Sequence, residues 1–156
     1  MDEKDRQFWD ACAKGDLAAA KLLWSFGGVN HRAVKDQTFR WACGKGHLET
    51  AQWVWSLCGV NHHADNDNAF RWACENGHLE TAQWVWSLGG VDHHADNDHA
   101  IRYACYHGHL KTGRWLISID PEFEWPNESL RKLQVVSDAR YAWMVAVVCN
   151  CHSIPR

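Results

Sequence analysis

The sequence has little that would direct it to a membrane, a nucleic acid or an oxidising compartment. None of its apolar runs approaches the ~20 residues that a membrane-spanning helix needs. The charged N-terminus lacks the apolar region of a secretory signal. The net charge of -3 is too small to steer the chain toward nucleic acid or an anionic membrane. We therefore expect a cytoplasmic protein that binds neither a membrane nor nucleic acid.

Catalytic signatures are missing as well. The chain has no Gly-rich phosphate loop, no G-x-S-x-G motif and no pair of acids in a shared setting. Its seven cysteines, without an export signal, indicate free thiols in a reducing compartment. We predict that the protein is not an enzyme, has no catalytic residue and binds no cofactor.

Repetition and tryptophan are what the sequence has in abundance. Eleven tryptophans are present, and one unit recurs every 31 residues. Residues 36–66 and 67–97 differ at only six of 31 positions. A period of this size is typical of stacked repeat arrays. The pattern predicts one domain over 1–156, with repeats at about 5–35, 36–66, 67–97 and 98–119.

The first half of each unit predicts a short helix. In the third unit, Asp67 or Asn68 can cap the helix N-terminus by accepting hydrogen bonds from its free N–H groups. Phe70, Ala73 and Cys74 then fall at i, i+3 and i+4, which places them on one helical face.

A second helix follows a glycine. Gly77 ends the first helix, because the position after a helix often adopts a left-handed conformation. Leu79, Ala82, Val85 and Trp86 form the next apolar stripe. Two helices of this length cannot bury both stripes alone, whereas stacking equivalent units does so.

Stacking at a fixed period predicts ladders of equivalent side chains. We expect two aromatic ladders, and a self-associating protein would in addition have an exposed tryptophan stripe. The ladders are Trp41, Trp72 and Tyr103, and Trp24, Trp55 and Trp86; the stripe is Trp53, Trp84 and Trp115. We expect a set of equivalent cysteines, roughly 10 Å apart from repeat to repeat, to be small buried hydrophobes, too far apart for disulfides or a shared metal. These are Cys12, Cys43, Cys74 and Cys105.

The run F-R-W-A-C-E-N-G-H-L-E at 70–80 resembles the middle of an ankyrin repeat. It is most similar to the Trp-rich ankyrin repeats of giant DNA viruses of amoebae, and the resemblance covers residues 5 to about 119. It implies an all-α helix-turn-helix solenoid that serves as a protein–protein interaction scaffold or adaptor. A viral origin would make the partner a host protein and the location the host cytoplasm. The resemblance also implies that His47, His78 and His109 bond backbone at the turn.

In proteins of this kind, contacts come from the end of the first helix and from the fingers that join the repeats. Carried over by position, the helix-end residues are Gly44, Lys45, Glu75, Asn76, Tyr106 and His107. The finger residues are His62, Asp65, His93 and Asp96. We expect these ten to bind a protein partner, with the chain itself a monomer.

Two other functions stay open. One is a structural or self-associating protein that uses the exposed tryptophan stripe. The other is a metal-binding protein that uses the finger histidines, since imidazole and carboxylate suit borderline metals. Adjacent histidines tend to point to opposite sides of an extended chain, so we predict no metal site there. The Cys149–Cys151 pair beside His152 is a second, weak metal signal.

The ends of the array depart from the pattern. In the first unit, Asp16 replaces the turn histidine and Asp10 replaces the ladder tryptophan. Beyond the fourth unit, 127–136 and 137–150 predict two helices that form a C-terminal helical cap over 120–156. The alternative is that this tail docks a partner, although it carries no matching tail motif.

Overall fold

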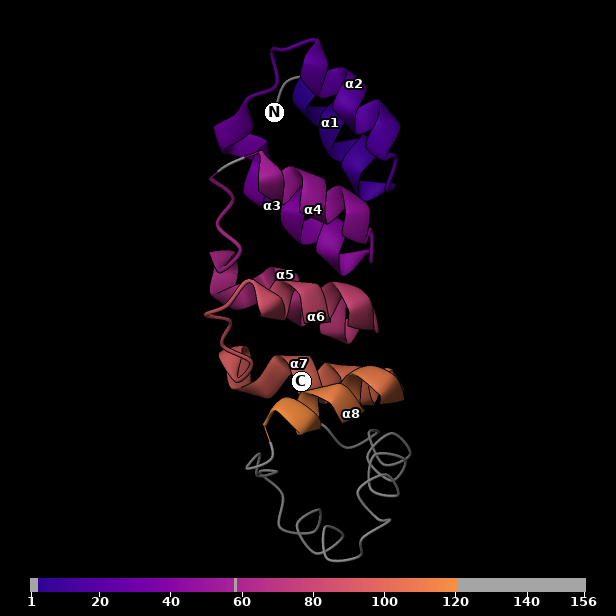
Figure 1. Cartoon of the computed structure of the whole chain (residues 1–156), viewed down its shortest axis with the longest axis vertical. Helices are drawn as coiled ribbons and strands as arrows, with labels where there is room; N and C mark the ends of the chain where they lie inside the picture. Colours follow the sequence, from indigo (N-terminus) through magenta and orange to yellow (C-terminus); the bar gives the residue numbers. More distant parts are fainter. Residues whose placement is uncertain (1–2, 58, 121–156) are drawn as a thin grey trace, which may run out of the picture.

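The chain folds into hairpin pairs of helices that stack in one direction. The computed structural model describes residues 3–57 and 59–120, except the side chains of 31–34. Within these residues the order is α1 (Glu3–Ala13), α2 (Leu17–Ser25), α3 (His31–Gly44), α4 (Leu48–Ser56), α5 (Ala64–Glu75), α6 (Leu79–Ser87), α7 (Ala95–Tyr106) and α8 (Leu110–Ile119). Figure 1 shows four pairs piled from α1/α2 to α7/α8. The all-α repeat solenoid with a period of 31 is confirmed. The predicted cap lies outside the described residues.

The core lies between the stacked helix pairs, and its most extensive contacts are those of α3 with α5 and of α5 with α7. The predicted inward positions are fully buried: Phe39, Ala42, Cys43, Phe70, Ala73, Cys74, Ala104 and Cys105 all have 0% exposure. Small Ala and Cys side chains permit close approach of the helices, and one Phe per repeat fills the space beside them. None of the described helices is long and apolar enough to cross a bilayer.

The cysteines in this core form no disulfide with one another. Cys12, Cys43, Cys74 and Cys105 are all buried, which confirms their predicted role as small hydrophobes. Burial raises the pKa of the Cys12 thiol to about 12 and raises the pKa values of Cys43 and Cys74 as well. The thiolate, which is the reactive form, is therefore scarce at neutral pH.

The second-helix tryptophans link neighbouring repeats, but not through equivalent positions. Trp24 packs against Trp53 of the next repeat at 6.1 Å between ring centroids, and the pattern recurs for Trp55 with Trp84 at 6.3 Å. Trp86 meets Trp115 at 6.4 Å. The predicted ladder is thus a series of offset pairs, because the ring of each second helix reaches toward a position two residues earlier in the unit that follows.

The predicted exposed stripe is wrong. Trp53, Trp84 and Trp115 are only partly exposed and pack against the core. Each also lies on the phenylalanine of the preceding repeat, at centroid distances of 6.1 Å for Phe8–Trp53, 6.0 Å for Phe39–Trp84 and 6.1 Å for Phe70–Trp115. The preceding repeat covers the side that an isolated helix would leave to solvent.

The first-helix ladder includes the first repeat, where its ring is Trp9 and not the residue at the equivalent position 10. Trp41 and Trp72 pack edge to face at 5.4 Å, as expected. In the first repeat, Trp9 takes the place expected to be empty and packs on Trp41 at 5.6 Å. Asp10, at the equivalent position by number, instead pairs with Lys14. The first repeat therefore joins the ladder.

Gly77 ends α5 as predicted. Its φ of +75° is left-handed, and the turn closes with a hydrogen bond of 2.8 Å from the His78 N–H to the Ala73 carbonyl. The expected cap at the start of the helix is wrong. Asp67 accepts hydrogen bonds from the Asp92 N–H (3.0 Å) and from His63 Nδ1 (2.6 Å), so it joins two successive fingers.

The chain enters α5 and α7 through an unusual left-handed turn. Asp65, Asn66 and Asp67 have φ values of 55°, 57° and 56°, and Asp96, Asn97 and Asp98 repeat this conformation. Asp and Asn tolerate this region better than other non-glycine residues. The right-handed part of each helix consequently begins only after these three residues.

A histidine of each later repeat packs on the turn glycine of the one before. His47 donates from Nε2 to the Ala13 carbonyl at 3.2 Å, the backbone contact that the resemblance implies. A Cβ added to Gly46 would lie 2.4 Å from Nδ1 of His78, and one added to Gly77 would lie 2.4 Å from Nδ1 of His109. Burial lowers the pKa of His78, and the neighbouring histidines and Lys45 add to this shift. The ring is therefore a neutral spacer between turns.

Replacing Gly77 by Ala should destabilise the stack through two effects. The left-handed backbone alone costs about 1–2 kcal/mol for a residue with a Cβ. The clash with His109 should add about 1–3 kcal/mol, a typical overpacking penalty. Gly108→Ala is the matched control, because its φ of +76° is nearly the same and no described atom lies within 4 Å of its Cβ position. Urea unfolding measures both free energies; equal losses would exclude the ring contact as a determinant of stability.

The core thiols should resist alkylation in the native protein. Peptides that contain Cys12, Cys43 or Cys74 should stay unmodified by iodoacetamide at pH 8, because the thiols are both buried and protonated. Unfolding in guanidinium chloride should expose them to complete labelling. Mass spectrometry resolves each peptide, and native labelling as fast as in the unfolded chain would contradict the packing described here.

Candidate protein-binding surface

Aromatic side chains reach solvent along one side of the first helices. Positions three and four residues after each ladder ring continue the same helical face. We call this surface the first-helix face; it comprises Trp41, Lys45, Trp72, Asn76, Tyr103, Tyr106 and His107. Tyr103 and Tyr106 are 37% and 46% exposed, while Trp41 and Trp72 are partly exposed. Lys45 places its Nζ 5.7 Å from the centre of the Trp41 ring.

The rings of the fourth repeat contact one another. Tyr106 and His107 pack edge to face at 5.0 Å, and Tyr103 lies 6.2 Å from Tyr106. His99 stacks on Tyr103 at 4.2 Å with an angle of only 19° between the planes. Mutual packing limits the rotamers of these rings, so a partner would meet a surface that is already ordered.

Two of the predicted helix-end residues have a structural explanation. Gly44 is buried, and a Cβ there would lie 3.2 Å from both Cβ and Cε3 of Trp72, so glycine makes room for the indole. Asn76 is exposed and donates from Nδ2 to the Trp72 carbonyl at 2.9 Å, closing the end of α5. Lys45 is exposed with its ammonium near Trp41. Gly44 is therefore a packing position, whereas Lys45 and Asn76 are accessible.

Glu75 and Asp96 are connected by His99, a residue outside the ten predicted ones, and His107 lies against the same glutamate. His99 donates from Nε2 to Glu75 at 3.0 Å, and its Nδ1 lies 3.6 Å from an Asp96 oxygen. His107 Nε2 lies 3.7 Å from the other oxygen of Glu75. His99 thus connects the helix end to the finger. Its signal in the sequence was a histidine where the preceding repeat has Asn68.

The predicted finger aspartates are engaged by arginines of the first helices. Asp65 pairs with Arg40, and Asp96 accepts a hydrogen bond of 2.6 Å from Nη1 of Arg71. The same guanidinium donates to the carbonyls of Asp65 and Asn66 at 2.9 and 2.8 Å. Because Arg71 contacts both the 65–66 segment and Asp96, it fastens one finger to the next. Both carboxylates remain more than half exposed, at 66% and 54%.

A second set of aspartates, missed in the sequence, ties each finger to its own helix. Asp5, Asp36 and Asp67 accept hydrogen bonds from the N–H groups of residues 30, 61 and 92 at 2.7, 3.0 and 3.0 Å. Asp98 continues this series at the same 31-residue spacing. The recurrence of aspartate at this spacing was the feature of the sequence that could have identified the set. These residues set the finger conformation on which the exposed side chains depend.

The finger histidines do not diverge as predicted. His62 and His63 have ring centroids only 3.9 Å apart, and His93 and His94 are 4.1 Å apart. His62 Nε2 donates to the Gly89 carbonyl at 3.2 Å. The hydrogen bond to Asp98 raises the pKa of His94, and nearby carboxylates add to this effect against the opposing effect of burial. His93, His94 and Asp120 are close enough together to hold a metal ion.

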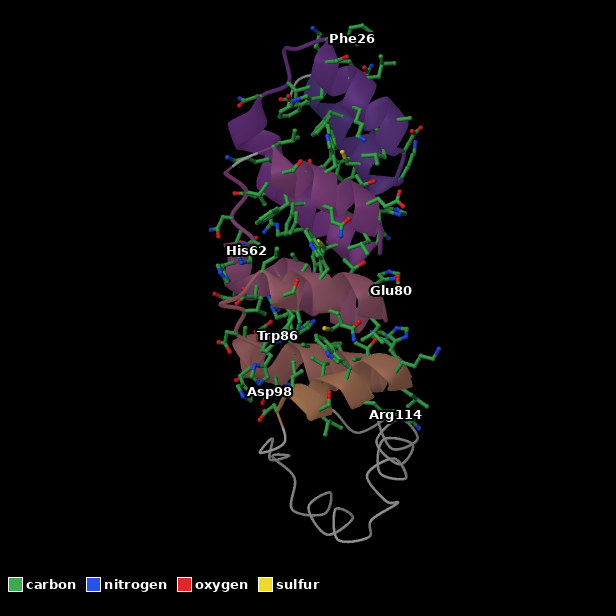
Figure 2. The ribbon with its side chains drawn as sticks, in the orientation of Figure 1. Phe26, His62, Glu80, Trp86, Asp98 and Arg114 are labelled. Atoms are coloured by element: carbon green, nitrogen blue, oxygen red, sulfur yellow. The ribbon has the colours of Figure 1, made fainter. Side chains whose placement is uncertain are left out.

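The finger residues and the turn side of the stack lie at opposite edges of the molecule. Figure 2 shows His62 and Asp98 on one edge and Glu80 and Arg114 on the other, with the first and second helices running between them. The ten predicted residues are thus split between a finger edge and the C-terminal ends of the first helices. Glu75 links the two groups, since it contacts His107 directly and Asp96 through His99.

Comparison with known proteins agrees with this architecture. A family model described as ankyrin repeats (3 copies) matches residues 39–124, more than half of the chain. No match was found among curated proteins. Ankyrin repeats generally mediate protein–protein interaction and are typically non-enzymatic scaffolds. The repeating helix pairs, the glycine turns and this match together establish that the chain belongs to the ankyrin-repeat family.

Proposed function

We propose that this protein is a non-enzymatic scaffold or adaptor that holds a partner protein on its first-helix face. The observation that carries the proposal is the exposure of Tyr103 and Tyr106 beside an ordered ladder of rings. Protein interfaces are enriched in tyrosine, tryptophan and arginine, and their strongest contacts centre on such rings.

Charge on this face adds specificity. Lys45 lies at one end, whereas Glu75 and His107 lie near the tyrosines. Charged groups around an aromatic centre guide orientation and association rate more than they add affinity. The finger residues Asp65 and Asp96, though paired with arginines, still expose carboxylate surface that a second part of the partner can contact.

Self-association through the second-helix tryptophans is the weaker alternative. Trp53, Trp84 and Trp115 are largely committed to packing within the stack, so they offer little free apolar surface. We accordingly propose a monomer that works in the cytoplasm. Its resemblance to the repeats of giant viruses of amoebae points to a host protein as partner.

Cross-linking from the surface tests the location. A photoreactive phenylalanine analogue at position 106 should capture a protein from an amoebal cytosolic extract, because this side chain reaches solvent on the proposed face. The matched control carries the analogue at 83, an exposed position on the second helix α6. Equal capture of the same protein from both positions would contradict the proposed location.

Substitutions then measure affinity for the captured protein. Tyr106→Ala should weaken binding at least tenfold, since removal of an aromatic anchor typically costs about 2 kcal/mol or more. Lys45→Glu should weaken binding chiefly by slowing association. Gln83→Ala should leave binding unchanged. Calorimetric titration gives the dissociation constants, and circular dichroism checks the fold. Wild-type affinity in both face variants would exclude this surface as the binding site.

A further inference from the structure

The last described finger holds three metal-ligating side chains around one point. His93 and His94 come from the finger before α7, and Asp120 comes directly after α8. Their donor atoms all lie within 4.8 Å of one another. Asp120 Oδ2 lies 3.4 Å from Nε2 of His93 and 3.3 Å from Nε2 of His94. Two chain segments, 26 residues apart in sequence, thus converge on a single carboxylate oxygen.

These separations suit a shared ion better than a hydrogen bond. N–H···O bonds are about 2.7–3.2 Å long, and neither His93 Nε2 nor Asp120 Oδ2 makes one, although both atoms are buried. In a tetrahedral zinc site with bonds of about 2.0–2.1 Å, neighbouring ligand atoms lie about 3.3 Å apart. The two measured separations match that edge. An ion between the three groups would also satisfy the two buried atoms.

The surroundings orient the ligands as metal sites require. His94 Nδ1 is hydrogen-bonded to Asp98 at 2.6 Å, which leaves Nε2 facing Asp120. A carboxylate on the second nitrogen of a histidine is a common support for metal ligation. His93 is fixed by edge-to-face packing on Trp86 at 5.4 Å. Ile101 and Leu116 complete the recess with apolar side chains.

The preceding repeat offers a natural comparison. His62 and His63 stack in the same way, and His63 Nδ1 is bonded to Asp67 at 2.6 Å. The position of Asp120 is taken there by Gly89, whose carbonyl accepts the hydrogen bond from His62. That histidine is satisfied by backbone and has no third ligand. Asp120 occupies the position equivalent to Gly89, and its carboxylate supplies the third ligand that the preceding finger lacks.

We propose that His93, His94 and Asp120 bind a zinc ion, with Asp98 positioning His94. Two imidazoles and one carboxylate are donors that zinc accepts readily. Three protein ligands leave a fourth position for water or for a side chain of a partner. Because the ligands join the finger to the end of α8, the ion would fasten the last described repeat.

Zinc titration of the untagged full chain tests the site. Protein stripped of metal with a chelator should bind zinc in calorimetry and retain it through dialysis, as counted by elemental analysis. Asp120→Asn and His93→Gln should each remove one equivalent. Asp98→Asn should retain the site with affinity weakened about 10–100-fold, as expected for a supporting carboxylate. Zinc should raise Tm in the wild type but not in Asp120→Asn.

Two control variants keep the result unambiguous. His62→Gln, the equivalent change in the preceding repeat, should bind zinc like the wild type. Cys149→Ser/Cys151→Ser removes the other candidate ligands of the chain and should keep the equivalent that depends on Asp120. Circular dichroism of each metal-free variant verifies its fold. No zinc binding, or zinc binding that survives both Asp120→Asn and His93→Gln in folded protein, would overturn the proposal.

Discussion

Contact between the phenylalanine of one repeat and the tryptophan of the next is the interaction on which this molecule depends. Phe8, Phe39 and Phe70 are at most 1% exposed, and each lies beneath a tryptophan supplied by the second helix that follows in the stack. Within its own repeat, Phe8 also contacts Trp24 at 5.5 Å and Phe70 contacts Trp86 at 5.9 Å, so the next repeat completes a cover that one helix pair begins. Each repeat is therefore stabilised by its neighbours, and the conformation of the fingers and of the first-helix face depends on this packing.

Much of the fold could be predicted because the period and the helical face are local properties of the sequence. Equal spacing of Phe70, Ala73 and Cys74 in successive units identified the buried face, and Gly77 identified the turn. The tryptophan contacts could not be predicted in the same way. A period aligns equal positions, whereas Trp55 meets Trp84 because the stacked helices are offset. The left-handed turn at Asp65 could not be predicted either, since Asp and Asn also favour helix caps and the residue types alone do not distinguish the two.

The candidate surface was predicted less completely, for a related reason. The exposure of Lys45 and Tyr106 could be predicted because exposure follows from helical position. Gly44 was misjudged because its role depends on the indole of Trp72 in the next repeat. The proposed three-ligand set was not predicted, although the finger histidines were considered, because Asp120 is distant in the chain and the two histidine rings stack instead of diverging. Contacts across repeats require the three-dimensional offset that a linear pattern does not contain.

The histidine of each turn gives the stack a polarity. His47 donates to a carbonyl of the repeat before it, so this contact is head-to-tail and does not close on itself. An open contact of this kind can in principle add copies without limit. At the first turn the equivalent residue is Asp16, whose carboxylate caps its own helix by accepting from the Ala19 N–H at 2.9 Å. A carboxylate would be repelled by a carbonyl, so the turn at Asp16 cannot make the hydrogen bond that His47 makes to the repeat before it.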